Sequence, residues 1–463
     1  MHSRFDNKHA TSYFMAAVIV LGIALRIVAG SNSLGFVHPD EHQQYLEAAN
    51  KIAFGYGVSF WEYERGIRHY LYPGSLAILL KLFDTIGISS PIHQAQIIRS
   101  LMGIGVFASV VMYSFGMLRQ KRHMAAFSLL VLATASPFFI FVGARTLSET
   151  ATIPLLMAML YFLDRRPGTA GFLAGIMFAV RFQSALFVAP LFFAMVVQRI
   201  VKDRSLAGLK SSARPFAASC IASLLLVGFI DYCTWGHWFH SPIEYVRANV
   251  VENVASSFGV SPWYQYAIWA YDSLIESTFL IIPLVCIGAW YCPRLAFAMA
   301  TFAVAHSFIG HKEPRFLWPM IPVVFVLVAV GIEHLSRCLS TQQKKYLVIG
   351  LSLTLIASVK FQWDATDWHM GRTETSALAL ARVREIEDVR GVALLGGDAH
   401  SGNLFYLRRD LPYLARTEWQ ELSTHALWKN GCLNYLIAEQ APEGTQFTLV
   451  SQVRDLSIFR VNP

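Results

Sequence analysis

The chain has 463 residues, of which 55% are hydrophobic and 15% are charged, and its mean hydropathy is +0.44. This composition excludes an ordinary soluble domain and indicates a multi-pass membrane protein. The net charge of +8 lies mainly in alternating loops, so it reflects membrane topology, and no nucleic-acid partner is expected. The six cysteines show neither metal-binding nor disulfide-framework spacing.

Apolar runs of spanning length predict an all-α membrane domain over residues 1–363, with about 11 transmembrane helices. The runs lie near residues 11–30, 94–118, 124–143, 149–163, 169–189, 186–200, 215–232, 272–291, 295–310, 316–335 and 346–361. The fifth and sixth runs overlap, so the boundary between them stays open.

Clusters of lysine and arginine orient these helices, because basic residues are retained on the cytoplasmic side. The clusters fall in every second loop and predict a cytoplasmic N-terminus. The first outer loop (31–93), the later outer loop (233–270), the turn 311–315 and the tail then lie on the non-cytoplasmic side. Residues 72–87 are apolar, but they are few and include charges, so we expect a helix along the membrane interface.

The tail, residues 364–463, differs in kind from the rest of the chain. It is polar and contains short apolar runs separated by turn residues, near 392–395, 435–438, 447–450 and 456–461. This pattern predicts a small soluble α/β domain on the non-cytoplasmic side.

The first outer loop begins with the sequence His38-Pro39-Asp40-Glu41. Proline and acidic residues are typical of a first helical turn, so one interpretation is a well-capped helix that runs to about Ala53. The other interpretation is catalytic, because a helix N-terminus keeps a carboxylate ionised and suits it to act as a general base in a partly dry cleft. Adjacent helical positions point about 100° apart, so only one carboxylate can face such a cleft.

The second polar stretch, residues 60–73, is a dense band of aromatic and charged side chains. Its candidate substrate-binding residues are Trp61, Glu62, Tyr63 and Arg68. One interpretation is an aromatic belt at the membrane interface with surface ion pairs. The other is a surface for a sugar phosphate, because flat rings suit the apolar faces of sugars and arginine binds phosphate.

The third polar stretch is a short turn before the run near 316–335. It holds four ionisable residues, namely His311, Lys312, Glu313 and Arg315. This density is costly at a membrane unless the groups are paired or functional. Besides a structural ion cluster, the turn predicts an anion site in which Lys312 and Arg315 hold a phosphate.

Single ionisable residues mark the ends of other runs, namely Arg145, Glu149, Arg181, Asp231 and His306. Each alone is more often structural, but all five map to the outer half of the topology, which favours a common cavity. The sequence contains no glycine-rich nucleotide loop and no Asp-x-Asp motif, so neither a metal nor another cofactor is expected.

Three motifs occur in order between about residues 36 and 319: the His-Pro-Asp-Glu turn, the WEY…GIR…YLYP stretch and the HKEPRF turn. Weaker matches are the segment 145–149, Arg181, and Asp231 followed by Trp235-Gly236. In these motifs the chain resembles glycosyltransferase family 22, the polyprenyl- or dolichyl-phosphate-mannose-dependent mannosyltransferases of N-glycan and GPI-anchor assembly.

The resemblance implies a GT-C fold and a metal-independent, inverting mannosyltransferase. The donor would be polyprenyl- or dolichyl-phosphate mannose, embedded among the membrane lipids. The acceptor would be a hydroxyl of a glycan or glycolipid. Asp40 would be the general base with Glu41 in support, and His311, Lys312 and Arg315 would bind the donor phosphate. Further substrate contacts would come from His38, Arg145, Glu149, Arg181 and Glu313.

Two alternatives stay open. One is a GT-C enzyme that transfers another sugar, such as glucose or an aminosugar, and the other is a multi-pass transporter of lipid or sugar. Transporters are typically built from repeats, and none is visible in this sequence. The sequence also contains no Asn-x-Ser/Thr sequon, which favours a bacterial inner membrane with a periplasmic active site over the ER membrane.

Overall fold

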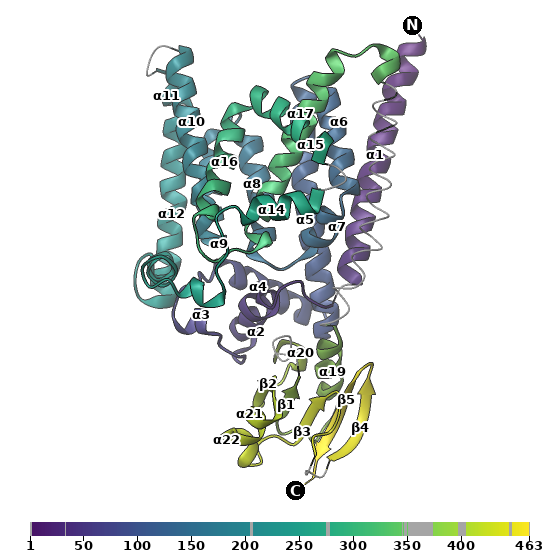
Figure 1. Cartoon of the computed structure of the whole chain (residues 1–463), viewed down its shortest axis with the longest axis vertical. Coiled ribbons are helices and arrows are strands. Elements are labelled where there is room, and N and C mark those ends of the chain that lie inside the picture. The colour runs from purple at the N-terminus through teal and green to yellow at the C-terminus, as the bar shows by residue number, and fades with distance from the viewer. Residues whose placement is uncertain are drawn as a thin grey trace.

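The computed structural model describes residues 2–32, 34–203, 207–274, 278–344, 374–396, 404–443 and 447–462, together with Tyr346 and Gly350. Most of the chain forms a bundle of helices, and a five-stranded sheet with short helices lies at one end of it (Figure 1). The N-terminus lies at the opposite end of the bundle (Figure 1).

The bundle helices share one large apolar core. They are α1 (His2–Ser31), α5 (Pro91–Arg119), α6 (His123–Ala135), α7 (Pro137–Phe141), α8 (Ser148–Phe162), α9 (Pro167–Val180), α10 (Ala185–Asp203), α11 (Ala207–Ser211), α12 (Ala213–Trp235), α15 (Thr278–Tyr291), α16 (Pro293–Ser307) and α17 (Ile321–Arg337). Short 3₁₀ turns join some of them: η2 (Val142–Ala144), η3 (Phe182–Ser184) and η6 (Pro314–Met320).

Five helices within the described residues are long and apolar enough to cross a membrane. They are Tyr13–Ser31, Pro91–Arg119, Phe182–Val201, Leu209–Trp235 and Pro314–Arg337. A sixth span results if α6 and the α7–η2 segment count as one bent span. The predicted multi-pass membrane protein is therefore confirmed, but the count of about 11 is not, and the last predicted run (346–361) lies outside the described residues.

The overlap between the predicted runs 169–189 and 186–200 corresponds to a break in the structure. The helix α9 ends at Val180, Arg181 adopts an extended conformation, and α10 begins only after η3. The run 169–189 was therefore predicted too long, because the apolar sequence continues through η3 into α10 although the helix α9 ends at Val180.

A second break separates α6 from α7, and the two segments differ in direction by 65°. Because Pro137 has no N–H, the carbonyl of Ala133 loses its helical donor. The buried guanidinium of Arg26 donates to this carbonyl and, at 3.1 Å, to that of Thr134. Backbone carbonyls inside a membrane protein must find such partners, so Arg26 stabilises the bend.

The helices α9 and α12 pack closely because α9 carries two glycines four residues apart. A Cβ atom at Gly171 would lie 2.0 Å from the carbonyl oxygen of Phe216, and one at Gly175 would lie 2.0 Å from the Ser223 hydroxyl. Gly105 of α5 is different, because no described atom lies within 4 Å of its ideal Cβ position. Only glycine therefore fits at Gly171, whereas Gly105 has room for a side chain.

Two groups of short helices connect the spans. The first lies between the bundle and the sheet (Figure 1) and comprises η1 (Glu41–Leu46), α2 (Glu47–Phe54), α3 (Trp61–Glu64) and α4 (Leu71–Thr85). The second comprises α13 (His240–Val246), η4 (Arg247–Val251), η5 (Val254–Phe258) and α14 (Gln265–Leu274). The carboxylate of Asp231 joins the groups, since it accepts from the Ser241 N–H at 2.9 Å and lies 3.5 Å from His69 Nε2.

The C-terminal sheet confirms the four predicted strands and adds a fifth. The strands are β1 (Val392–Leu395), β2 (Tyr413–Arg416), β3 (Tyr435–Ala438), β4 (Phe447–Val453) and β5 (Leu456–Val461). Their order is β2-β1-β3-β5-β4, with β1 parallel to both neighbours and β5 antiparallel to both of its neighbours. The unpredicted strand β2 is as short as β1 and β3, but it ends in Arg416, whereas every residue of β1 and β3 is apolar.

Short helices flank the sheet, namely α19 (Glu374–Arg384), α20 (Leu404–Leu407), α21 (Trp419–Thr424) and α22 (Ala426–Lys429). One apolar cluster continues from the first outer loop into this domain and includes Leu76, Leu80, Leu380, Phe405 and Ile437. The domain therefore packs against the loop that contains Asp40. Its predicted start at residue 364 lies outside the described residues.

A buried carboxyl lies within this contact. Glu47 accepts hydrogen bonds from the Val58 N–H at 2.7 Å and from the Phe405 N–H at 2.8 Å. Burial outweighs both hydrogen bonds and raises the pKa of Glu47 to about 7. The contact between the loop and the domain therefore contains a group that changes its charge near neutral pH.

We predict that Gly171→Ala lowers the melting temperature (Tm) by several degrees, because the new methyl group meets the backbone of α12. The control Gly105→Ala makes the same change where space is open and should not lower Tm, since alanine favours a helix over glycine by about 1 kcal/mol. Differential scanning fluorimetry in detergent measures both variants. Equal Tm values would contradict the close contact between α9 and α12.

We also predict a pH-dependent stability difference between the wild type and Glu47→Gln. The folded-state pKa of Glu47 lies above its ordinary value of 4.5, so its contribution is fully present below pH 4.5 and is lost as the pH rises through about 7. The loss amounts to roughly 3 kcal/mol, from about 1.4 kcal/mol for each pKa unit. Glutamine does not titrate, so the Tm of the wild type minus that of the variant should fall between pH 5 and pH 8; a constant difference would refute the assignment.

Candidate functional site

Asp40 lies where the loop after α1 enters η1. Its Oδ2 accepts a hydrogen bond from Arg315 Nη1 at 2.7 Å, and its Oδ1 lies 3.4 Å from His38 Nδ1. Burial alone would raise the pKa of Asp40, but Arg315 and His38 outweigh burial and hold this pKa well below its usual range. The side chain is 15% exposed, so an ionised carboxylate remains accessible.

Arg315 is the centre of a group of ion pairs. Its Nε lies 2.6 Å from Glu313 Oε2, and its Nη1 lies 3.7 Å from Glu149 Oε1 in the first turn of α8. Glu313 also lies 3.0 Å from His311 Nε2 and 3.3 Å from His38 Nε2. One guanidinium therefore faces three carboxylates from three separate parts of the chain.

Glu41 belongs to a different, fully buried cluster. Its Oε1 accepts a hydrogen bond from the Val37 N–H at 2.8 Å, and its Oε2 lies 3.7 Å from both Arg99 Nη2 and Arg145 Nη1. The adjacent carboxylates thus make separate contacts, as expected for neighbours on one helix. The predicted support of Asp40 by Glu41 during catalysis stays a prediction.

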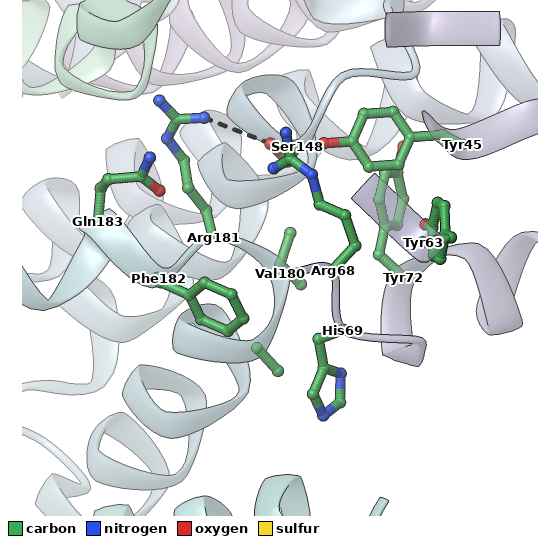
Figure 2. A pocket seen from close by; sticks show the side chains of 11 residues that line it. Tyr45, Tyr63, Arg68, His69, Tyr72, Ser148, Val180, Arg181, Phe182 and Gln183 are labelled. Carbon is green, nitrogen blue, oxygen red and sulfur yellow. Dashed lines mark hydrogen bonds between the residues drawn. The ribbon is translucent and has the colours of Figure 1, made fainter. Parts of the chain in front are cut away.

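A cavity lies between the first outer loop and the bundle (Figure 2). It is lined by Tyr45, Tyr63, Arg68, His69, Tyr72, Ser148, Ala179, Val180, Arg181, Phe182 and Gln183. Arg181 connects the cavity to the ion pairs around Arg315, because its Nη1 lies 2.8 Å from Glu149 Oε1.

Two arginines reach this cavity from different elements (Figure 2). Arg68 comes from the loop before α4, and Arg181 from the break between α9 and α10. Arg181 Nη1 also donates to Ser148 Oγ at 3.4 Å, but its Nε and Nη2 have no hydrogen-bond partner among the described residues. The Nε of Arg68 is likewise buried without a described partner. Such unsatisfied N–H groups are suited to an anionic ligand.

The other residues of the second polar stretch have varied positions. Glu62 is buried and accepts a hydrogen bond from Gln44 Nε2 at 2.7 Å, while Tyr63 donates its hydroxyl hydrogen to the Gln44 carbonyl at 2.7 Å. Both residues therefore hold η1. Trp61 lies at the surface, where its ring stacks on Phe258 with centroids 6.1 Å apart.

Lys312 makes its hydrogen bonds with backbone carbonyls. Its Nζ donates to Ser261 at 2.9 Å and to Ile309 at 2.5 Å. It thereby anchors the later outer loop to the turn that contains Arg315. Among the predicted phosphate ligands, Lys312 and Arg315 are thus both engaged with protein groups.

Sequence reasoning missed several members of the site. Arg99 lies inside the predicted run 94–118, and an ionisable residue within a span was the signal that could have identified it. Tyr45 carried no comparable signal, because its neighbours in the cavity come from distant parts of the chain.

The arrangement combines an ionised carboxylate with guanidinium groups that face a cavity. Among the residues that the structure describes, no group of three or more His, Cys, Asp or Glu side chains could hold a metal ion. The ionised carboxylate of Asp40 is chemically suited to accept a proton, and the guanidinium groups of Arg68 and Arg181 are suited to bind an anion.

A family model described as the Alg9-like mannosyltransferase family matches residues 17–366. Similar proteins include GPI mannosyltransferase 3 of Yarrowia lipolytica, 28% identical over 75% of this chain and 68% of that protein. Mannosyltransferase APTG1 of Arabidopsis thaliana is 24% identical over 69% of this chain and 59% of its own length. GPI alpha-1,2-mannosyltransferase 3 of Homo sapiens is 23% identical over 76% and 63%. The chain thus matches about three-fifths to two-thirds of these relatives.

Among solved structures, ArnT from Cupriavidus metallidurans in the apo state superposes with a TM-score of 0.66 at 12% identity, covering 97% of this chain and 98% of ArnT. A structure of ArnT bound to undecaprenyl phosphate gives a TM-score of 0.61 at 12% identity, with the same coverage. The oligosaccharyltransferase of Archaeoglobus fulgidus in the apo form gives 0.54 at 12% identity over 92% and 69%. At this identity the similarity shows the fold alone, and it confirms the GT-C fold.

Proposed function

The chain belongs to the Alg9-like mannosyltransferase family, and from this premise we propose that it transfers mannose from a polyprenyl-phosphate carrier to a hydroxyl of a glycan or glycolipid, with inversion. Family membership confirms the predicted family and the enzyme class, a membrane glycosyltransferase. The observation that carries the proposal is the ionised carboxylate of Asp40, held by Arg315 close to a cavity with unsatisfied guanidinium groups.

Asp40 would act as the general base. The acceptor hydroxyl attacks the anomeric carbon of mannose, and the carboxylate takes the hydroxyl proton. The bond between the anomeric carbon and the phosphate oxygen breaks, and the phosphate keeps the electron pair. A carboxylate with a lowered pKa is a weak base, but a weak base suffices because the phosphate is a good leaving group.

Two sets of cations are candidates for the donor phosphate. The turn 311–315 was predicted for this role, and this stays a proposal, although Lys312 already binds carbonyls and Arg315 binds carboxylates. We favour Arg68 and Arg181, since their unsatisfied N–H groups are at the cavity. A developing negative charge there would be stabilised by groups fixed in advance.

An apolar groove of about 550 Å³ supports a lipid-linked donor. It runs between α9, α10 and α12, and its wall includes Phe178, Val188, Phe192, Phe216 and Leu224. Ser184 of η3 lines the groove too, so the groove starts close to Arg181. We assign this groove to the isoprenoid chain of the donor, because an apolar chain there would bring its phosphate towards the cavity. The similar ArnT structure contains undecaprenyl phosphate.

For the acceptor we propose a glycolipid of the GPI type, following the names of the relatives in Yarrowia lipolytica and Homo sapiens. The family match does not favour the two alternatives, a different sugar and a transporter. A bacterial inner membrane has no support among these eukaryotic relatives, so we propose the ER membrane. The first outer loop and the C-terminal domain would lie together on the non-cytoplasmic side of this membrane. We keep the predicted count of about 11 transmembrane helices as part of the proposal.

We predict that Asp40→Asn lowers kcat by about a hundredfold or more, because the general base is lost, and lowers Tm less than the control below does, because Arg315 keeps the carboxylates of Glu149 and Glu313. The matched control is Glu41→Gln at the next position. It should cost stability, by roughly 3–5 kcal/mol, because it leaves two buried guanidinium groups without a carboxylate. Transfer from synthetic polyprenyl-phosphate mannose to a mannosyl glycolipid, together with Tm, measures both effects. Robust turnover by Asp40→Asn would reverse the assignment.

A further prediction separates the two phosphate sites. If Arg68 and Arg181 bind the phosphate, Arg68→Ala and Arg181→Ala should each lower kcat/KM for the donor, by a factor that corresponds to roughly 2–4 kcal/mol of transition-state stabilisation, and lysine at either position should restore part of it. Lys312→Ala should then disturb the later outer loop more than it lowers kcat/KM for the donor. Loss of donor use in Lys312→Ala, with Arg68→Ala near the wild type, would instead place the phosphate at the turn 311–315.

A further inference from the structure

The C-terminal domain inserts one short helix against the helical segment that begins beside Asp40. All four side chains of α20 are buried, and Phe405 and Tyr406 are fully inaccessible to solvent. Apolar packing would suffice to attach the domain. The contact nevertheless includes buried polar groups, which cost free energy unless they are paired.

The first polar contact joins Tyr406 to His42. The Tyr406 hydroxyl lies 3.1 Å from His42 Nε2, and Arg99 Nη2 lies 3.1 Å from the same nitrogen. A guanidinium can only donate, so Nε2 carries no hydrogen, and its one lone pair is shared between Arg99 and the Tyr406 hydroxyl. The imidazole is thus held from two sides, by the C-terminal domain and by α5.

The second polar contact joins the Phe405 N–H to Glu47 at 2.8 Å. His42 and Glu47 follow Asp40 on one continuous helical segment, so α20 contacts this segment at both ends of η1. η1 is a π-helix, a rare form that is common at functional sites and depends on its surroundings for stability. Contacts from outside the segment therefore decide where η1, and with it Asp40, lies.

We propose that Tyr406 is a positioning residue for the transfer reaction. Through its hydrogen bond to His42, it fixes the π-helical turn so that the Asp40 carboxylate stays against Arg315 and faces the substrates. This inference rests on the proposed function only in taking Asp40 as the base. It gives the C-terminal domain a role in catalysis without any contact to the reacting atoms.

The test compares Tyr406→Phe with the matched control Tyr435→Phe. Each change removes one hydroxyl from a buried tyrosine of the same domain, but the Tyr435 hydroxyl donates to Asp388 at 2.7 Å, within the domain. Tyr406→Phe should lower kcat by about tenfold and leave KM for polyprenyl-phosphate mannose unchanged, because a displaced base affects the chemical step alone. Tyr435→Phe should retain the kcat of the wild type.

A second comparison excludes a merely structural role. In the Asp40→Asn background, Tyr406→Phe should not lower the residual rate further, because no carboxylate remains to be positioned. A fall of similar size in that background, or equal losses in the Tyr406 and Tyr435 variants, would overturn the proposal.

A third readout does not depend on mannose transfer. Hydrogen–deuterium exchange should become faster at residues 41–47 in Tyr406→Phe and stay unchanged there in Tyr435→Phe. Unchanged exchange in both variants would overturn the inference even if the enzyme transfers mannose. An inactive wild type in which Tyr406→Phe still loosens residues 41–47 would instead refute the proposed function and leave the structural basis of the inference supported.

Discussion

The contact between Asp40 and Arg315 is the constraint on which the rest of the site depends. It joins positions 275 residues apart, the loop after α1 and the turn before α17. Arg315 faces two further carboxylates, and one positive charge cannot balance three negative charges. Arg181 supplies a second positive charge from another part of the chain, 2.8 Å from Glu149. These ion pairs join the start of η1, α8, the residue before η3 and η6 at one place.

The neighbouring Glu41 lies in a cluster with an excess of positive charge, because its one carboxylate lies between the guanidinium groups of Arg99 and Arg145. Buried ion pairs add little net stability, because desolvation offsets most of the Coulomb attraction. Their effect here is geometric. Successive residues are attracted in two directions, by Arg315 and by the buried pair of arginines, and this fixes the rotation of η1. The direction of Asp40 thus depends on both clusters.

The sequence identified the residues of the site better than their arrangement. The turns 38–41 and 311–315 were recognisable because charges at membrane level are expensive without a purpose. Local sequence could not show that Lys312 would bind carbonyls of the later outer loop, since those partners lie about 50 residues away in the chain. The π-helical form of η1 was equally hidden, and one partner of this segment, Tyr406 beside His42, lies 364 residues away in the chain. The short strands β1 and β3 were predicted because all of their residues are apolar, and β2, which ends in Arg416, was not.

Broken helices connect the membrane bundle to the chemistry. A break inside a membrane leaves backbone carbonyls without donors, which Arg26 corrects at the bend before Pro137. The break after α9 instead places Arg181 at the cavity while Ser184 opens onto the apolar groove. An unbroken helix would have kept this arginine on a helical face among apolar neighbours. The break after α9 shortens a span, and it also brings Arg181 close to the apolar groove. The proposed lipid-phosphate sugar donor would require this combination of a charged group and an apolar groove.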